Sequence, residues 1–218
     1  MSAVISYPSL NPSENPFAAD LLIVFATSNK DKAKELKEIF TDYDILTLDD
    51  ICFEGEITED GKTFEENALI KAKAAFEACG LPCVADDSGL CVDALNGAPG
   101  IYSARYSGGG YLDNCLKLMQ EMKDVPEEKR GAQFVSAAAL YAKKGDEIIS
   151  AFTLGKVPGK IGFEMKGEGG FGYDPLFIEN STMLTYAEMT KEEKNSLSHR
   201  KLAFEALKPE VEKLFEEE

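Results

Sequence analysis

The chain has 218 residues, 44% of them hydrophobic, which is enough to bury one substantial core. Its formal net charge of −16 argues against nonspecific nucleic-acid binding, which needs a basic face against the phosphate backbone. No apolar run reaches the length of a membrane span, and no repeat or low-complexity tract divides the sequence. We therefore expect one domain of two lobes at residues 21–218 that binds neither nucleic acid nor a membrane.

Hydrophobic periodicity predicts an α/β chain. Helices are expected at 30–40, 63–78, 111–122 and 198–215, and strands at 21–26, 45–48, 83–85, 133–141, 148–154 and 175–178. Pro209 is expected to break or kink the last helix. Two consecutive strands flank residues 143–146, a hairpin signal that predicts a mixed rather than a purely parallel sheet.

Residues 1–20 form an extension before the first predicted strand. Pro8, Pro12 and Pro16 alternate with Ser and Asn, a composition that favours an extended or disordered arm. Its apolar residues leave docking on the domain as an alternative. The segment lacks the basic, acidic-poor character of a transit peptide.

A small polar loop follows the first strand. Thr27, Ser28 and Asn29 lie between the apolar run 21–26 and a helix that carries Lys32. Backbone N–H groups and the positive end of the helix dipole would face an anion there, and Lys32 adds a full charge. The loop lacks the glycines and the Gly-Lys-Ser/Thr ending of a Walker loop. A phosphate-binding loop and a plain helix N-cap are both consistent with this pattern.

Paired carboxylates follow the buried strand 83–85. Asp86 and Asp87 fall at the expected end of this strand, and Ser88 and Gly89 are expected to turn the chain. Because successive strand residues point to opposite faces, one carboxylate can meet a ligand while the other holds the loop or supports the site. The pattern predicts a place to hold a metal ion, and a solvated acidic turn is the alternative.

Glycines surround two aromatic residues in the segment KGEGGFGYDPLFI, residues 166–178. Glycines such as Gly172 let the backbone approach a flat ligand, and Phe171 would supply a stacking face worth about 1–3 kcal/mol for a nucleobase. Asp174, which follows Tyr173, would accept hydrogen bonds from a base edge. The alternative is a glycine-rich turn with Phe171 packed in the core.

The C-terminal segment contains two helix-start signals. Thr190 and Glu193 have capping-box spacing, and Ser198 can cap the last helix. This places His199, the only histidine, and Arg200 at a helix start. A lone histidine is usually structural or solvated, so its position beside Arg200 carries more weight than its chemistry.

The five cysteines show no metal-ligand spacing, and one histidine cannot complete a usual zinc site. Cys79 and Cys83 lack the further ligands that such a metal site would need. Because the number of cysteines is odd and no signal peptide is evident, we expect reduced thiols in a cytoplasmic protein.

Taken together, these segments resemble the inosine triphosphate pyrophosphatase family, enzymes that remove non-standard purine nucleoside triphosphates from the nucleotide pool. The family's motifs occur here in the family's order, from residue 21 to the last helix. They are Thr27/Asn29/Lys32, Glu66/Asn67/Ala68/Lys71, 85–90, 97–105, 170–175 and 198–200. Each motif is weak alone, but all of them in register are specific. The extension 1–20 departs from the pattern, because members usually begin close to their first strand.

The resemblance implies a long mixed sheet, two lobes around a cleft, and a homodimer. It also implies hydrolysis of ITP, dITP or XTP between the α and β phosphates, giving a nucleoside monophosphate and pyrophosphate with Mg²⁺ as cofactor. Asp87 would be the water-activating carboxylate and a metal ligand, with Asp86 in support. Glu59 is the expected further metal ligand, and Glu56 or Asp60 in the same acidic loop are alternatives.

Lys71 lies one turn beyond Asn67 on the same helical face, so both can reach one cleft. The resemblance assigns the phosphates to Lys32 and Lys71, and the base to residues 171–174 and 194–200. In full, the expected substrate contacts are Thr27, Ser28, Asn29, Lys32, Lys71, Ser88, Phe171, Gly172, Tyr173, Asp174, Lys194, His199 and Arg200.

Two alternatives belong to other functional classes. A purine nucleotide sensor that does not hydrolyse its ligand would keep Phe171, Asp174 and Arg200 but lose the acidic cluster, which this chain retains. A metal-dependent phosphatase of other phosphoesters would use the carboxylates without a base pocket and would release orthophosphate. The identity of the phosphate product separates the two enzymatic alternatives.

Overall fold

The computed structural model describes residues 21–216, so the expectation about the extension 1–20 lies outside the described residues. The strands are β1 (Leu22–Phe25), β2 (Asp44–Thr47), β3 (Cys83–Val92), β4 (Gly131–Lys144), β5 (Glu147–Ile161) and β6 (Phe177–Glu179). The α-helices are α1 (Lys30–Ile39), α2 (Phe64–Cys79), α3 (Tyr111–Glu121), α4 (Lys191–Ser196) and α5 (His199–Phe215). Short 3₁₀ helices are η1 (Asp93–Leu95), η2 (Gly100–Arg105) and η3 (Glu127–Lys129).

One mixed sheet organises the molecule, in the strand order β2-β1-β3-β4-β5-β6. β1 pairs in parallel with β2 and β3, and the remaining neighbours are antiparallel. The predicted hairpin is β4–β5, where Lys144 pairs with Glu147 and the intervening Gly145 has a φ of +59°. The α/β class and the mixed sheet predicted from the sequence are therefore confirmed.

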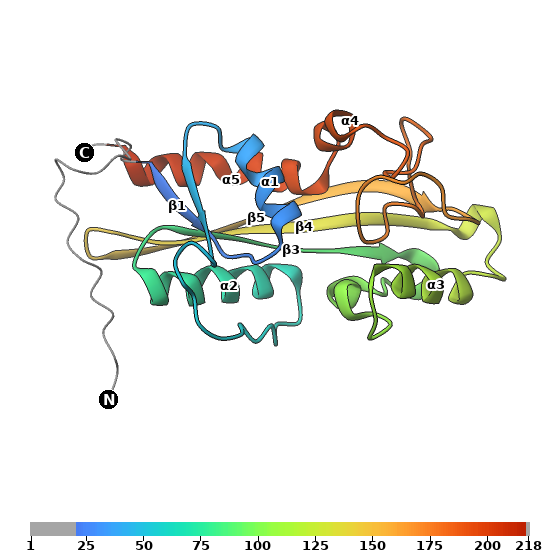
Figure 1. Cartoon of the computed structure of the whole chain (residues 1–218), viewed down its shortest axis with the longest axis horizontal. Helices are drawn as coiled ribbons and strands as arrows, with labels where there is room; N and C mark the ends of the chain where they lie inside the picture. Colours follow the sequence, from blue (N-terminus) through green and yellow to red (C-terminus); the bar gives the residue numbers. More distant parts are fainter. Residues whose placement is uncertain (1–20, 217–218) are drawn as a thin grey trace.

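Helices cover both faces of this sheet (Figure 1). α1 and α5 lie on one face, where Phe204 packs edge-on against Phe25 and Phe40 with ring centroids 5.6 and 5.9 Å away. α2 lies on the other face and packs there through small residues, Ala68, Ala72 and Ala75. α3 covers the same face farther along β3 and β4, over a separate apolar cluster.

Strand β3 is longer than predicted. The prediction that it ends at Ala85 and turns at Ser88 and Gly89 is wrong, because β4 pairs with it residue by residue through Val92. Gly89 does not form a turn but allows η2 to pack closely against β3. A Cβ atom there would lie 2.3 Å from the Gly100 carbonyl oxygen, so only glycine lets η2 cross this strand.

The last helix also continues through a residue that was expected to interrupt it. α5 continues through Pro209, so of the expected break or kink the break is wrong. Pro209 is exposed, and buried Phe204, Leu207 and Val211 anchor the helix on both sides of it. α4, which was absent from the predicted helices, begins at the predicted capping box of Thr190 and Glu193. Within residues 21–216 no helix is both long and apolar enough to cross a bilayer.

Candidate active site

The structure contains a pocket of about 180 Å³ whose lining includes residues of α1, α2 and the middle of β3. Its lining contains most of the residues that the sequence singled out, from five separate parts of the chain. These are Asn29, Lys32, Glu59, Lys71, Asp87, Ser88, Phe171, Gly172, Tyr173, Asp174, Lys194, His199 and Arg200. Thr27 and Ser28 do not line it. The Thr27 hydroxyl accepts a hydrogen bond from the Asn29 backbone N–H at 3.1 Å, and Asn29 caps α1.

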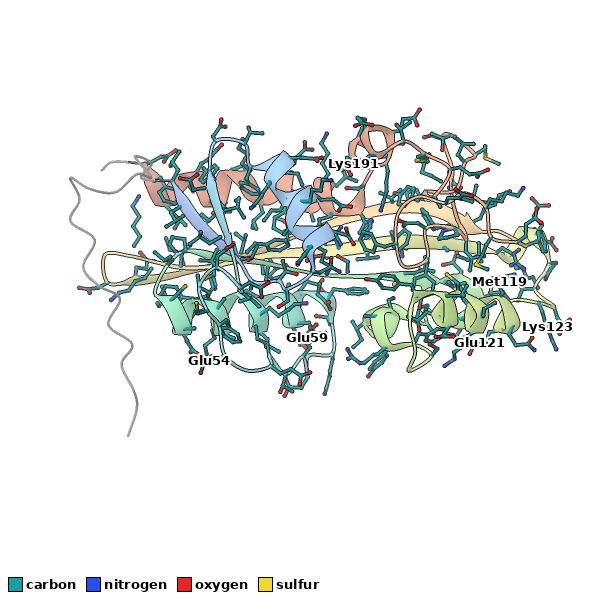
Figure 2. The ribbon with its side chains drawn as sticks, in the orientation of Figure 1. Glu54, Glu59, Met119, Glu121, Lys123 and Lys191 are labelled. Carbon is teal, nitrogen blue, oxygen red and sulfur yellow. The ribbon has the colours of Figure 1, made fainter. Side chains whose placement is uncertain are left out.

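Asp87 faces α2, at one end of the pocket. Lys71 Nζ lies 3.2 Å from Asp87 Oδ1, and Asn67 donates to Asp87 Oδ2 at 3.2 Å, which confirms that one helical face carries both residues to the cleft. The same Lys71 ammonium lies 3.0 Å from Glu59. Glu59 belongs to the loop before α2, where Figure 2 labels it. Of the three acidic candidates in that loop, Glu59 lines the pocket.

The pKa values of Asp87 and Lys71 depend on burial and on their charged neighbours. It raises the pKa of the Asp87 carboxyl, an effect that Lys71 opposes and Glu59 reinforces. Burial alone would lower the pKa of Lys71, but Asp87, Asp86 and Glu59 together raise it above its ordinary value. Lys71 therefore remains an ammonium, while Asp87 is a carboxylate that takes up a proton more readily than an exposed aspartate does.

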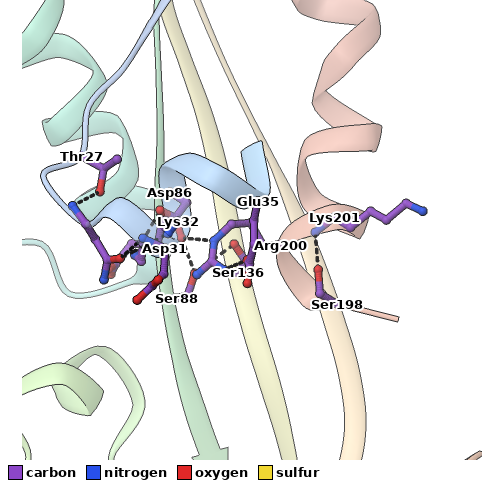
Figure 3. A network of polar contacts seen from close by, with 12 residues as sticks. Thr27, Asp31, Lys32, Glu35, Asp86, Ser88, Ser136, Ser198, Arg200 and Lys201 are labelled. Atoms are coloured by element: carbon purple, nitrogen blue, oxygen red, sulfur yellow. Dashed lines mark hydrogen bonds and ion pairs between the residues drawn. The ribbon is translucent and has the colours of Figure 1, made fainter. Parts of the chain in front are cut away.

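Asp86 points to the opposite face and takes part in a buried polar network (Figure 3). It accepts hydrogen bonds from Lys32 Nζ at 3.1 Å, Arg200 Nε at 3.0 Å and the Ser88 hydroxyl at 2.5 Å. Glu35 completes the network with an ion pair to Arg200. Although burial would raise the pKa of Asp86, Lys32 and Arg200 hold it well below its usual range. The expected divergence of the two aspartates is thus confirmed.

The other end of the pocket is aromatic. Phe171 is half-buried and not part of the packed core, and the Lys194 ammonium lies 4.5 Å from its ring centroid. Lys194 also pairs with Asp174 at 2.7 Å, and Asp174 accepts the Phe171 backbone N–H at 2.7 Å. Tyr173 is buried, and its hydroxyl donates to the Ser103 carbonyl at 2.9 Å. The Phe171 ring is therefore held at the pocket wall with one part of it accessible.

His199 follows the Ser198 cap of α5, as predicted, and is buried. Its ring stacks on Phe134 with centroids 4.8 Å apart, and its Nδ1 atom has no hydrogen-bond partner in the described part of the chain. Burial, Arg200 and Lys194 hold the pKa of His199 well below its ordinary value, so the ring is neutral at pH 7. A buried and unpartnered ring nitrogen in a pocket wall is available to a ligand.

Asp87 and Glu59 offer carboxylate oxygens, the kind of ligand that suits a hard divalent cation. An ammonium already bridges Asp87 and Glu59, so cationic charge is accommodated between them. Such cations often bind through one or two carboxylates, substrate phosphates and retained waters. Between residues 21 and 216, no group of three or more His, Cys, Asp or Glu side chains could enclose a metal alone. The pair thus fits a cation shared with a phosphate ligand.

Several pocket residues had no signal in the sequence. Tyr111, Asn114 and Phe134 also line it, and they come from segments read only as helix or strand, whereas Ser103 lies in the family motif 97–105 but was assigned no role. Glu35 was missed as well. Its position one turn after Lys32 on α1 was a usable signal, since both residues then reach the same network.

The fold and the pocket define an α/β protein whose cleft joins carboxylates, lysines and an aromatic wall. A sequence model of the Ham1 family matches residues 23–210, and the chain belongs to this family. It is 47% identical to the dITP/XTP pyrophosphatase of Nocardia farcinica over 194 residues, covering 86% of this chain and 93% of that one. It is 45% identical to the enzyme of the same name from Haemophilus influenzae, covering 87% of this chain and 98% of that one.

Solved structures agree with the sequence comparison. The Staphylococcus aureus Ham1 protein superposes with a TM-score of 0.79 at 39% identity, covering 88% of this chain and 98% of that one. A nucleoside-triphosphatase, dITP/XTP pyrophosphatase, from Mycobacterium abscessus superposes with a TM-score of 0.71 at 43% identity, covering 87% of this chain and all (100%) of that one. The likeness to the inosine triphosphate pyrophosphatase family found in the sequence is thereby confirmed.

Proposed function

We propose that this protein hydrolyses non-standard purine nucleoside triphosphates, ITP, dITP and XTP, to the nucleoside monophosphate and pyrophosphate. The observation that carries the proposal is the pocket itself, which has the Asp87–Lys71–Glu59 cluster at one end and the Phe171 ring at the other. A nucleotide has the matching polarity, with anionic phosphates at one end and a flat base at the other. The names of the curated relatives, dITP/XTP pyrophosphatases, support the same substrate class.

At the phosphate end, we assign Asp87 as the proton acceptor for the attacking water, because its buried carboxylate has a raised pKa. Lys71 and Lys32 would hold phosphate oxygens, and Asn29 would present the N-terminus of α1 to them. Asp87 and Glu59 would hold Mg²⁺, which when bound would supply charge neutralisation to the phosphates. Phosphoryl transfer depends mainly on such positioning and charge, so no protein nucleophile is needed.

At the base end, we assign stacking to Phe171 and hydrogen bonding to His199 and Arg200. Two N–H groups of Arg200 point to Asp86 and Glu35, so these carboxylates fix the plane of the guanidinium. Its remaining N–H donors suit the 6-keto oxygen of hypoxanthine or xanthine, whereas adenine would present an amino donor to them. Lys194 and Asp174 would hold the segment around Phe171 against the base.

The base assignment is tested with a nucleotide panel. Purified protein is incubated with Mg²⁺ and ITP, dITP, XTP, GTP or ATP, and kcat/KM is measured for each. A site built to bond a keto oxygen should favour ITP and XTP over ATP by about 10⁴-fold. Equal kcat/KM values for ITP and ATP would contradict the assignment.

We further propose a homodimer that acts in the cytoplasm. Tyr102, Leu112, Phe152 and Leu154 are apolar side chains between 39 and 60% exposed, and burial of such surface on a second copy would be favourable. The cysteines are all free, which is consistent with a reducing compartment. Light scattering of the purified full chain tests the dimer, and a monomer mass at micromolar concentration would contradict it.

A further inference from the structure

Cys79 and Cys83 form a thiol pair that the sequence spacing did not reveal. Cys79 is the last residue of α2 and Cys83 is the first residue of β3, and their Sγ atoms lie 3.7 Å apart. Gly80, in the left-handed conformation with a φ of 72°, turns the chain between them. On sequence alone these cysteines were considered only as metal ligands, and their mutual contact is a separate finding of the structure.

The two thiols have different environments. Cys79 is half-buried at a helix end, whereas Cys83 is fully buried and its Sγ lies 3.2 Å from the Leu81 carbonyl oxygen. The contact with the Cys83 thiol lowers the pKa of Cys79 to about 7, although burial opposes this. The same contact and burial raise the pKa of Cys83. Cys79 is thus the more acidic and the less buried thiol of the pair, and Cys83 is the buried thiol in contact with it.

No other pair of cysteines is placed in this way. The remaining three all lie in the described part of the chain, and none of them contacts another thiol there. Cys52 is exposed, Cys91 is half-buried, and buried Cys115 donates to the Gly172 carbonyl at 3.2 Å. To bond, Cys79 and Cys83 must approach by roughly 1.7 Å, the difference between their 3.7 Å contact and an S–S bond of about 2.0 Å.

We propose that Cys79 and Cys83 are a modification site, at which hydrogen peroxide converts the thiol pair to an intramolecular disulfide. In the first step the Cys79 thiolate attacks one peroxide oxygen, the O–O bond breaks, and the departing hydroxide takes a proton to become water. Cys79 is then a sulfenic acid. In the second step the Cys83 sulfur attacks the Cys79 sulfur, the S–O bond breaks, and the hydroxyl leaves as water with the Cys83 proton. Two thiols are oxidised and one peroxide is reduced to two waters.

Cys79 and Cys83 lie on the same two elements that carry residues of the pocket. α2 carries Asn67 and Lys71 two to three turns before Cys79, and β3 carries Asp87 four residues after Cys83. The disulfide would therefore join the ends of the two elements that contact each other through Lys71 and Asp87. Neither cysteine lines the pocket, so the pocket side chains stay chemically unchanged.

The experiment uses the reduced full chain and hydrogen peroxide as the probe. Intact mass spectrometry should show the loss of two hydrogen atoms, reversed by dithiothreitol, and fragment ions should place the bond between Cys79 and Cys83 and exclude Cys91. Cys79→Ser should abolish the disulfide. Cys83→Ala should leave a sulfenic acid at Cys79 that a dimedone probe captures, and the control Cys91→Ser should behave as wild type.

A second measurement keeps the proposal testable if a variant folds poorly. In the wild-type chain, the rate of Cys79 alkylation by iodoacetamide should rise with pH around a midpoint near pH 7. In Cys83→Ala this midpoint should move up toward the ordinary thiol value of about 8.5. Over-oxidation of Cys79 with Cys83 left as a free thiol, or a disulfide that excludes either residue, would overturn the proposal.

Discussion

The neighbouring aspartates of β3 should respond in opposite ways to the same substitution. Asp86 is 2% exposed and is paired with Lys32 and Arg200. In Asp86→Asn, Lys32 loses its carboxylate partner and Arg200 keeps only Glu35. Breaking a buried ion pair by removing one partner costs about 3–5 kcal/mol. At about 2–4 °C per kcal/mol for a chain of this size, the melting temperature should fall by roughly 6–20 °C.

Asp87→Asn should change activity instead of stability. Lys71 keeps its 3.0 Å partner Glu59, and the neutral amide removes a charge that burial makes unfavourable. The free energy of unfolding should therefore change by less than about 1 kcal/mol, in the range of ordinary substitutions. Pyrophosphate release from ITP should fall by at least about 10²-fold, because the proton acceptor for water is lost.

Both quantities are measured on both variants, by thermal unfolding without ligand and by steady-state pyrophosphate release at saturating Mg²⁺. Because the folded-state pKa of Asp86 is depressed, its contribution is complete above the unfolded-state value and is lost as pH falls. The stability gap between wild type and Asp86→Asn should accordingly shrink below about pH 4. Near-wild-type turnover of Asp87→Asn, or an unchanged melting temperature of Asp86→Asn, would refute the division of roles.

Two further substitutions test the aromatic end. Phe171→Ala should weaken nucleotide binding by about 1–3 kcal/mol, mainly through KM, with little change in the melting temperature of the free protein; a large drop in that temperature with IMP affinity intact would place the ring in the core. For His199, the unfolded chain takes up a proton below about pH 6.5 that the folded chain does not, so stability should fall between pH 7 and 5 by up to about 1.4 kcal/mol per pH unit. His199→Phe should remove this slope while Asp87 and Asp174 titrate in both proteins, and parallel stability curves for the two proteins would contradict the buried neutral ring.

Local sequence signals predicted the parts of the site that depend on short-range geometry. Asn67 and Lys71 reach the same carboxylate because they are one helical turn apart. The N-caps at Asn29, Thr190 and Ser198 follow from side chains that accept backbone N–H groups of the first turn. Alternation along a strand likewise predicted that the two aspartates diverge.

Features that depend on distant partners were not predicted. β3 extends past Ala85 because β4 pairs with it. The two strands are far apart in the sequence, since the contacting residues Ser88 and Ser136 are 48 positions apart. The role of Asp86 depends on Arg200, 114 residues away, and Arg200 in turn on Glu35, 165 residues away. No local pattern encodes such contacts, since the fold alone brings these groups together.

Product analysis of ITP hydrolysis tests the central claim most directly. Phosphorus NMR of the reaction of the full chain with ITP and Mg²⁺ separates IMP, IDP, pyrophosphate and orthophosphate in one sample. Cleavage between the α and β phosphates predicts IMP and pyrophosphate in equal amounts, with no orthophosphate formed in step with turnover. Release of orthophosphate with IDP as the other product would contradict the claim and identify a phosphatase, and ITP that binds but remains intact would identify a nucleotide sensor.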